Sequence, residues 1–391
     1  MKDNLWIQNT PQIFWQLQTS IDAKHWRKAI QNALPLIGLK DKFDDLDDLP
    51  RLTLGEKQFG GNPWKLSIPK KVYYELKPIL PRQLTKVMRQ LYGENKKENF
   101  LLDWPVEDRY AQYLWEITRQ LLKINGKESF PFTSFWPSGY SYAFILTHDI
   151  ETARGQSEIR SIMRLETEHG FRSSFNFVPE RYELDHKLIC DLQNEGFEVG
   201  LHGLKHDGKL FSSRREFDKR ADKINSHLAE FNAIGFRAPL THRNPYWMQS
   251  LNIEYDLSFF DTDPFEPIPG GTMSIWPFIL GNFVELPYTL PQDYTLIEVL
   301  NEKSPKLWLD KVDFIKKYHG MVLLNSHPDY LLTKENLEIY ATFLSAMKNR
   351  EDYWHALPRE VASWWKRRIT RERHTNISTV KLKNNELIII T

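Results

Sequence analysis

The chain has 391 residues, of which 41% are hydrophobic and 26% are charged, values typical of globular proteins and far from those of disordered chains. Its 52 Lys and Arg residues nearly balance its 51 Asp and Glu residues, so bulk charge gives no reason to expect a nucleic-acid partner. The single cysteine, Cys190, excludes an intramolecular disulfide and a zinc cluster built from several cysteines.

The sequence also predicts a cytoplasmic location. The N-terminal stretch "MKDNLWIQNTPQIFWQ" lacks the apolar core of a secretory signal peptide. No window of the sequence approaches the roughly 18 consecutive apolar residues of a membrane span. A single cysteine is consistent with a reducing compartment. We therefore expect a protein of the cytoplasm without a transmembrane segment.

Residues 1–135 are predicted to form an α-rich N-terminal region of unknown role. Apolar residues spaced three and four apart predict amphipathic helices after Pro81 and over 106–122. Basic residues flank an apolar face in 72–92, which raises the alternative of peripheral contact with a membrane surface. A helix packed on the rest of the protein is favoured, because this placement of charge is common on soluble helices.

Short β-type runs alternate with helical segments from residue 142 onward. The runs cover 143–148, 173–178, 197–201, 234–237, 253–259, 282–286 and 320–326. Strand–helix alternation on this scale predicts a parallel sheet, and seven strands favour closure into a barrel. The clearest helix is predicted over 214–232, and Ser213 with Glu216 forms a candidate capping box at its start.

The predicted organisation therefore has three parts. The α-rich region over 1–135 precedes an α/β barrel over 136–370. A short tail over 371–391 is predicted to form a β-hairpin that turns at Asn384 and Asn385.

Polar residues follow four of the predicted strands at the points where these strands end. In barrels of this kind the carboxyl ends of the strands build the active site, because their loops converge there. The residues in question are His148, Asp149, Glu151, His202, His206, Arg237 and His327.

These residues allow both functional and structural interpretations. Two histidines and a carboxylate suit a divalent metal with open coordination positions. Asp149 alone could cap the segment after its strand, Arg237 could form a buried ion pair, and His327 could be a turn histidine. We predict a structural role for His148, because its side chain should point away from that of Asp149.

The motifs "THDIE", "HGLKH", "RAP" and "LNSH" occur in this order in the sequence. In order and spacing they resemble those of the NodB-homology polysaccharide deacetylases, carbohydrate esterase family 4, over residues 140–370. The stretch "DIETARG…LETEHGFRSSFNFVP" is also similar to the opening of cytosolic formamido-arabinose deformylases of that superfamily. The resemblance implies a deformed (β/α)7 barrel, a divalent metal that is often zinc, and hydrolysis of an N-acyl group on an amino sugar.

Matched position by position, the resemblance implies three catalytic residues. Asp149 would be the base, Arg237 would orient that base, and His327 would be the general acid. The backbone N–H of Leu240 would help to hold the oxyanion, and Trp276 is a candidate for the aromatic wall of a sugar pocket. A core tryptophan is an equally good interpretation of Trp276.

The same resemblance implies that Glu151, His202 and His206 are the metal ligands. This chain departs from the usual pattern, because Ile150 stands where many members have the metal aspartate. Glu151 is one methylene longer than that aspartate, and Leu240 replaces a tyrosine. A further aspartate motif of the family has no clean counterpart, so the carboxylate partner of Arg237 stays open among Asp256, Asp261 and Asp263.

The sequence thus predicts a metal-dependent hydrolase that removes an acetyl or formyl group from an amino sugar or glycan precursor. One alternative is an amidohydrolase of the same fold that acts on a small non-sugar amide. Another is a catalytically degenerate barrel that binds glycan without turnover, for which Ile150 and Glu151 are the best argument.

Overall fold

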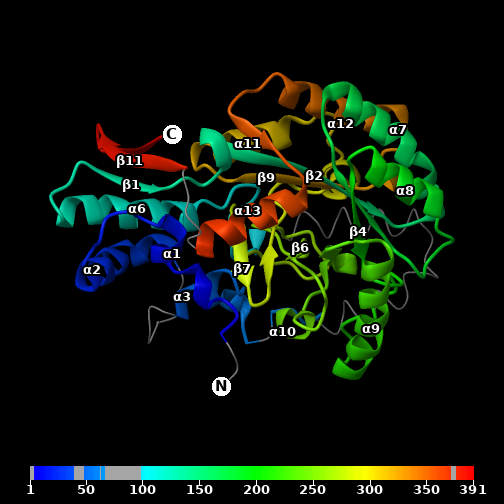
Figure 1. Ribbon diagram of the computed structural model, residues 1–391, viewed down its shortest axis with the longest axis horizontal. Coiled ribbons are helices and arrows are strands. Elements are labelled where there is room, and N and C mark those ends of the chain that lie inside the picture. Colours follow the sequence, from blue (N-terminus) through cyan, green and yellow to red (C-terminus); the bar gives the residue numbers. More distant parts are fainter. Residues whose placement is uncertain (1–3, 39–47, 62, 67–97, 371–375) are drawn as a thin grey trace.

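The computed structural model of the chain describes residues 4–38, 48–61, 63–66, 98–370 and 376–391. In Figure 1 the curved main sheet and the helices around it lie on the right, and further helices with a small separate sheet lie on the left. The helix predicted after Pro81 and the membrane contact considered for 72–92 lie outside the described residues. Within the described ranges, no helix combines the length and the hydrophobicity needed to cross a membrane.

Seven parallel strands form the barrel part of the main sheet in the described chain, in the order β9-β2-β3-β4-β5-β6-β8. They are β2 (Tyr142–Ile150), β3 (Ser174–Phe177), β4 (Glu198–His202), β5 (Gly235–Arg237), β6 (Tyr255–Asp256), β8 (Phe283–Glu285) and β9 (Met321–Ser326). All seven coincide with runs predicted from the sequence, so the predicted parallel sheet is confirmed. Two further strands join this sheet: β7 (Phe278–Leu280) pairs antiparallel with β8, and β10 (Tyr353–His355) pairs parallel with the start of β2.

The two ends of this sheet approach each other and are bridged by backbone hydrogen bonds. The N–H groups of Thr289 and Leu290, just after β8, donate to the carbonyl of Leu323 in β9 at 3.1 and 3.2 Å. The N–H of Met321 donates to the carbonyl of Ile275, before β7, at 2.7 Å. Closure through irregular segments rather than a continuous ladder gives the deformed (β/α) barrel that the sequence predicts.

Helices cover the outside of the barrel (Figure 1). They are α7 (Ala153–His169), α8 (His186–Asn194), α9 (Arg214–Glu230), α10 (Pro245–Met248), α11 (Lys306–Lys317), α12 (Lys334–Lys348) and α13 (Pro358–Thr370). With helices outside and side chains filling the interior, all nine residues of β2 are buried, which explains its unbroken apolar run. At the start of α9 the Ser213 hydroxyl accepts the N–H of Glu216 at 3.2 Å, as predicted, while the Glu216 carboxylate binds Arg220.

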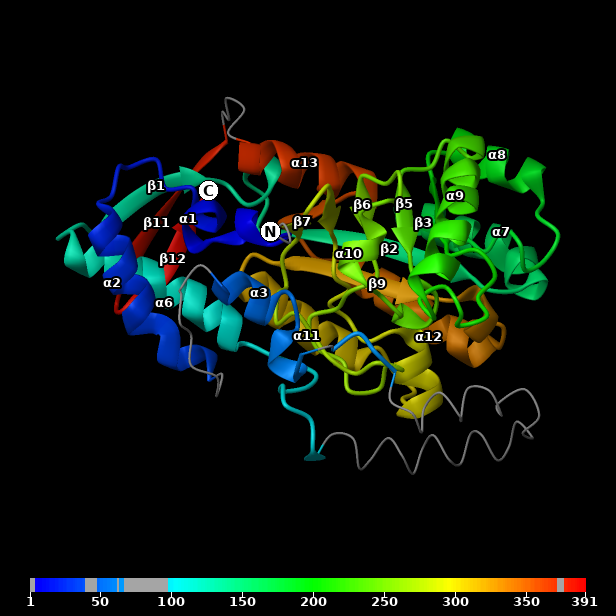
Figure 2. The same ribbon diagram turned by 90° about the horizontal axis from the view of Figure 1, so that it is seen from below.

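The N-terminal and C-terminal segments pack together beside the barrel (Figure 2). The helices are α1 (Pro11–Trp15), α2 (Ala23–Ala33), α3 (Leu49–Thr53) and α6 (Arg109–Ile124). Strand β1 (Ser129–Thr133) pairs with β11 (Ile377–Lys383), which pairs with β12 (Glu386–Ile390). The turn between β11 and β12 uses Asn384 and Asn385 with positive φ values of 50° and 65°, as tight hairpin turns require.

The N-terminal segment also covers the edge strand β7. The side-chain amide of Asn9 donates to the carbonyl of Ile279 at 2.7 Å, and its oxygen accepts the N–H of Ile279 at 2.9 Å. One side chain thereby satisfies both backbone groups that an edge strand would otherwise leave open.

Candidate active site

The site residues predicted from the sequence lie at the carboxyl ends of four barrel strands. Because these strands are parallel, their carboxyl ends face the same rim of the barrel. Strand by strand, Asp149 and Glu151 lie at the end of β2, His202 ends β4 with His206 four residues later, Arg237 ends β5, and His327 follows β9.

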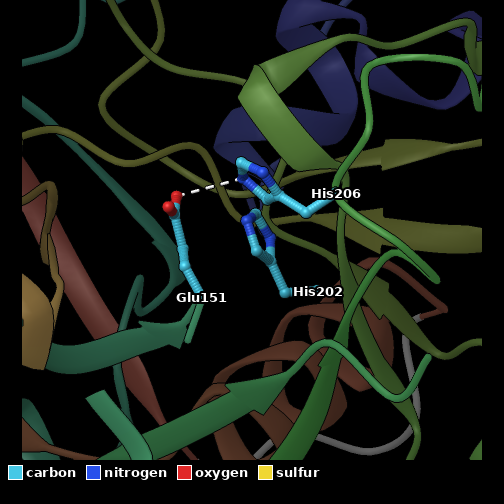
Figure 3. A group of neighbouring side chains, drawn as sticks. All are labelled: Glu151, His202 and His206. Carbon is cyan, nitrogen blue, oxygen red and sulfur yellow. Dashed lines mark ion pairs between the residues drawn. The ribbon is translucent and has the colours of Figure 1, made fainter. Parts of the chain in front are cut away.

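Three of these residues form a group that could hold a metal ion. One ligand atom of each of Glu151, His202 and His206 lies within 4.8 Å of the other two. Figure 3 shows the Glu151 carboxylate pointing from the end of its strand towards the two imidazoles. Its Oε1 lies 3.0 Å from Nε2 of His206, and the two imidazole rings are 5.0 Å apart between centroids.

A loop, not a helix, brings the two histidines together. Gly203 and His206 have positive φ values of 66° and 52°, so the chain turns sharply after β4. A Cβ on Gly203 would lie 2.3 Å from Cγ of Pro239, so only glycine fits where the loop after β4 contacts the loop after β5. The described segment from His202 to His206 is therefore not helical.

The surroundings of His202 fit a metal ligand. Its side chain is 3% exposed, and neither ring nitrogen has a hydrogen-bond partner in the described part of the chain. Buried polar groups are usually partnered, so two open nitrogens favour a role that needs a free lone pair. Burial lowers the pKa of His202 to about 4, against the attraction of the Asp149 charge, which keeps the imidazole neutral, as ligation requires.

Asp149 is held by hydrogen bonds on both carboxylate oxygens. Its Oδ1 accepts from Nδ2 of Asn176 at 3.0 Å and from Nη1 of Arg237 at 3.2 Å, and its Oδ2 accepts from Nδ2 of Asn325 at 3.0 Å. Burial alone would raise the pKa of Asp149, but the Arg237 guanidinium and the nearby histidines outweigh burial and lower it well below the usual range. Asp149 is therefore ionised and fixed in direction.

Arg237 contacts the base from the end of β5 and is 1% exposed. Its Nη1 also donates to Oδ1 of Asn325 and to the hydroxyl of Thr147, while its Nε donates to the carbonyl of Leu257 at 2.8 Å. None of the three aspartates considered from the sequence is its hydrogen-bond partner in the described chain. The arrangement suits a residue that orients Asp149.

His327 lies on the other side of the site and is oriented by Asp293. Its Nδ1–H donates to Oδ1 of Asp293 at 2.7 Å, and its backbone N–H donates to Oδ2 at 2.7 Å. Its Nε2 therefore faces the site, 3.8 Å from Oδ2 of Asp149 and 3.9 Å from Oε1 of Glu151. Burial lowers the pKa of His327, but the charges of Asp293, Glu151 and Asp149 raise it overall, to about 10.

The structure separates the two remaining predicted residues. Leu240 lies in the loop after β5 with a φ of 58°, and this loop contacts the His202–His206 segment through Pro239. Trp276 is 1% exposed, stacks on Trp115 with 5.6 Å between ring centroids, and donates its indole N–H to the carbonyl of His319. His319 precedes β9 whereas the site follows it, so Trp276 lies towards the opposite end of the barrel and is a core tryptophan.

Comparison with solved structures returns polysaccharide deacetylases and an allantoinase. A protein from Mycobacterium smegmatis assigned as a polysaccharide deacetylase shares 16% identity over 60% of this chain and 93% of its own, with a TM-score of 0.47. The allantoinase PuuE shares 14% identity over 62% of this chain and 95% of its own, with a TM-score of 0.49. A protein from Pseudomonas aeruginosa, also assigned as a polysaccharide deacetylase, shares 14% over 60% and 94%, with a TM-score of 0.48.

No family model and no curated protein matches the chain. Identities of 14–16% are too low to transfer an activity or a substrate. The chemistry is therefore argued from the side chains of this chain.

Three residues of the site were not predicted from the sequence as functional: Asp293, Asn176 and Asn325. Asn325 stands inside the quoted motif "LNSH", whereas Asn176 lies in the short apolar strand "SFNF" and Asp293 in a loop. A polar residue in a strand whose four residues are all buried is the signal that could have identified Asn176. Asp293 has no comparable signal, because its partner is 34 residues away in the chain.

His148 has the structural role predicted for it. Its side chain points away from Asp149, with Nε2 2.7 Å from Oε1 of Glu166 and Nδ1 2.9 Å from the hydroxyl of Ser326. Glu166 also accepts from Ser173 and Tyr340, so the network is fully buried and polar.

Removing the imidazole of His148 should lower stability without affecting the site. We expect His148→Ala to reduce the free energy of unfolding by about 3 kcal/mol, because it leaves the Glu166 carboxylate buried without its main partner. Urea denaturation of the metal-free protein measures this loss. An unchanged midpoint would contradict the structural role.

Proposed function

We propose that the protein is a metal-dependent hydrolase that removes an N-acyl group, acetyl or formyl, from an amino sugar or glycan precursor. The observation that carries the proposal is the group of Glu151, His202 and His206 with Asp149 and His327 beside it. Two imidazoles and one carboxylate fit zinc or a similar divalent ion. The resemblance of the motifs to those of NodB-homology deacetylases directs the proposal to amino-sugar substrates.

The residues of the site divide the chemistry between them. A divalent ion, when bound, would lower the pKa of water and polarise the acyl oxygen. Asp149 is ionised and held by three hydrogen bonds, so it can accept the proton that the attacking water loses. His327, with Nδ1 fixed by Asp293, can deliver a proton from Nε2 to the departing amine nitrogen. The backbone N–H of Leu240 would contribute to holding the oxyanion.

We further propose that the protein works in the cytoplasm. The described chain contains one cysteine, which is exposed and free, as a reducing compartment permits. There an amino sugar would be attached to a nucleotide or a lipid during glycan synthesis. Detection of the native protein outside the cytoplasmic membrane would contradict this.

The proposal is tested by measuring acyl release. The zinc-loaded protein is incubated with N-acetyl and N-formyl amino sugars, free and linked to a nucleotide or lipid, and free acetate or formate is quantified. Release from an amino sugar, lost on chelation, is the expected result. Turnover of allantoin-type amides alone would favour the small-amide alternative. Zinc binding without release from any substrate would favour a glycan-binding barrel.

Asp293 should matter for turnover and not for binding of the metal. Asp293→Asn replaces the negative acceptor that orients His327, so we expect kcat to fall by about 10–100-fold with KM little changed. The comparison is Asp313→Asn, which removes a charge that pairs with Arg350 on the surface, where Asp313 is 66% exposed. Equal activity of the two variants would show that Asp293 does not support the acid.

A further inference from the structure

Glu151 occupies an unusual place for a metal ligand. It lies one residue beyond the end of β2, whose last residue is the buried apolar Ile150. A residue outside the strand lacks the ladder hydrogen bonds that fix the residues inside it, and a glutamate side chain has one more rotatable bond than an aspartate. An ordered ligand at this position therefore needs support from elsewhere in the fold.

Two consecutive residues after β3 contact Glu151 and its peptide. The hydroxyl of Tyr182 donates to the carbonyl of Ile150 at 2.6 Å, which fixes the peptide plane that leads into Glu151. The guanidinium of Arg181 lies 3.8 Å from Oε2 of Glu151. Its side chain is 34% exposed, at the rim of the site.

The two oxygens of the Glu151 carboxylate thus face different partners. Oε1 faces His206 at 3.0 Å, and Oε2 faces Arg181 on the other side. On the following residue, the hydroxyl of Thr152 donates to Asp329. The backbone before Glu151, its side chain and the residue after it are each held by a different contact.

We propose that Arg181 and Tyr182 are positioning residues that hold Glu151 towards His202 and His206 and thereby set the affinity for the divalent ion. The inference rests on the proposed metal centre. It explains how this chain uses a longer carboxylate, one residue later than the metal aspartate of many members of the family it resembles. A partly exposed ion pair with 3.8 Å between its charged atoms adds little to folding stability, so the effect of Arg181 is expected in metal affinity and not in stability.

Tyr182→Phe is the decisive variant, because it removes one hydroxyl and no charge. We expect its zinc affinity, measured by competition with a chromogenic chelator, to fall about 10-fold, within the range for residues that support metal ligands. Tyr340→Phe is the matched control, since it removes a hydroxyl that bonds to Glu166 away from the metal group. Urea denaturation of both metal-free variants separates loss of stability from loss of affinity.

Arg181→Ala tests the second contact. We expect a fall in zinc affinity of about 10-fold, partly restored in Arg181→Lys. Arg160→Ala is the control, because it removes a surface ion pair in which the Arg160 guanidinium lies 2.6 Å from the Asp191 carboxylate. This variant should leave the zinc affinity unchanged.

The outcomes separate this inference from the function on which it rests. A native protein that binds no zinc would overturn the metal centre and the positioning role together. Zinc bound by the native protein and equally by Tyr182→Phe and Arg181→Ala would overturn the positioning role alone. A raised KM in these variants with unchanged zinc affinity would show that the pair contacts substrate instead, which also overturns it.

Discussion

Asp149→Asn should reduce kcat by about 10²–10⁴-fold, the usual contribution of a positioned acid or base, and leave zinc bound. The amide has nearly the size of the carboxylate but cannot accept the proton from the attacking water. The three ligand atoms proposed for the ion belong to other residues, so the ion should stay. The kcat is measured with the substrate that the acyl-release assay identifies. The zinc content is measured by metal analysis of the purified variant.

The variant should fold, because Arg237 keeps contacts that do not involve Asp149. Its bonds to Asn325, Thr147 and the carbonyl of Leu257 remain. Asp191→Asn, which removes a partly exposed carboxylate paired with Arg160, is the control for loss of one negative charge. Wild-type kcat in Asp149→Asn would remove Asp149 from the mechanism, whereas loss of zinc in this variant would assign it to the metal.

The strands and the gathering of site residues at one rim could be predicted from the sequence. Buried parallel strands give short apolar runs, and helices between them give a period near 3.6, so both patterns are local. Asp149, His202 and Arg237 each stand at the end of such a run. Parallel pairing then places these ends together without any knowledge of individual contacts.

The contacts that orient these residues could not be predicted in the same way. The carboxylate that orients His327 is Asp293, which caps a π-helical segment (Tyr294–Val299) and carries no motif. The contact of Arg237 with Asp149 agrees with the sequence, but none of the three aspartates considered as its carboxylate partner bonds to it in the described chain. Asp261 pairs with the buried Lys311, and Asp256 accepts from Ser258. Such pairings depend on tertiary distances that no spacing in the sequence encodes.

Trp276 illustrates the limit for aromatic residues. A tryptophan in a loop after a barrel strand is compatible with a sugar-binding wall or with the core, and the sequence offers both interpretations. The choice depends on the N-terminal region, whose Phe14 and Trp115 pack against Trp276. The core at this end is therefore shared between the barrel and a segment more than 150 residues earlier in the chain.

His202→Ala and His206→Ala should each lower the zinc affinity by at least about 100-fold. This is a larger effect than the one expected for a residue that only holds a ligand in place. Each variant removes one of the three ligand atoms of the group, and the imidazole and carboxylate that remain cannot hold the ion at micromolar zinc. Activity should be lost in both variants in proportion to zinc occupancy. Equilibrium dialysis with zinc, followed by metal analysis, measures the affinity.

His148→Ala is the contrasting variant for this prediction, because His148 is also a buried histidine at the end of β2 but bonds to Glu166 and Ser326. His148→Ala should lose stability and keep zinc. His202→Ala should lose zinc and keep most of its stability, because the His202 ring has no hydrogen bond to lose among the described residues.

If all three variants lost zinc and stability together, the group of Glu151, His202 and His206 would be part of the folded core and not a metal site. If zinc is lost only in the variants of His202 and His206, the ion is bound where the open nitrogens of His202 lie, and the acyl-release assay alone then decides between a hydrolase and a glycan-binding barrel.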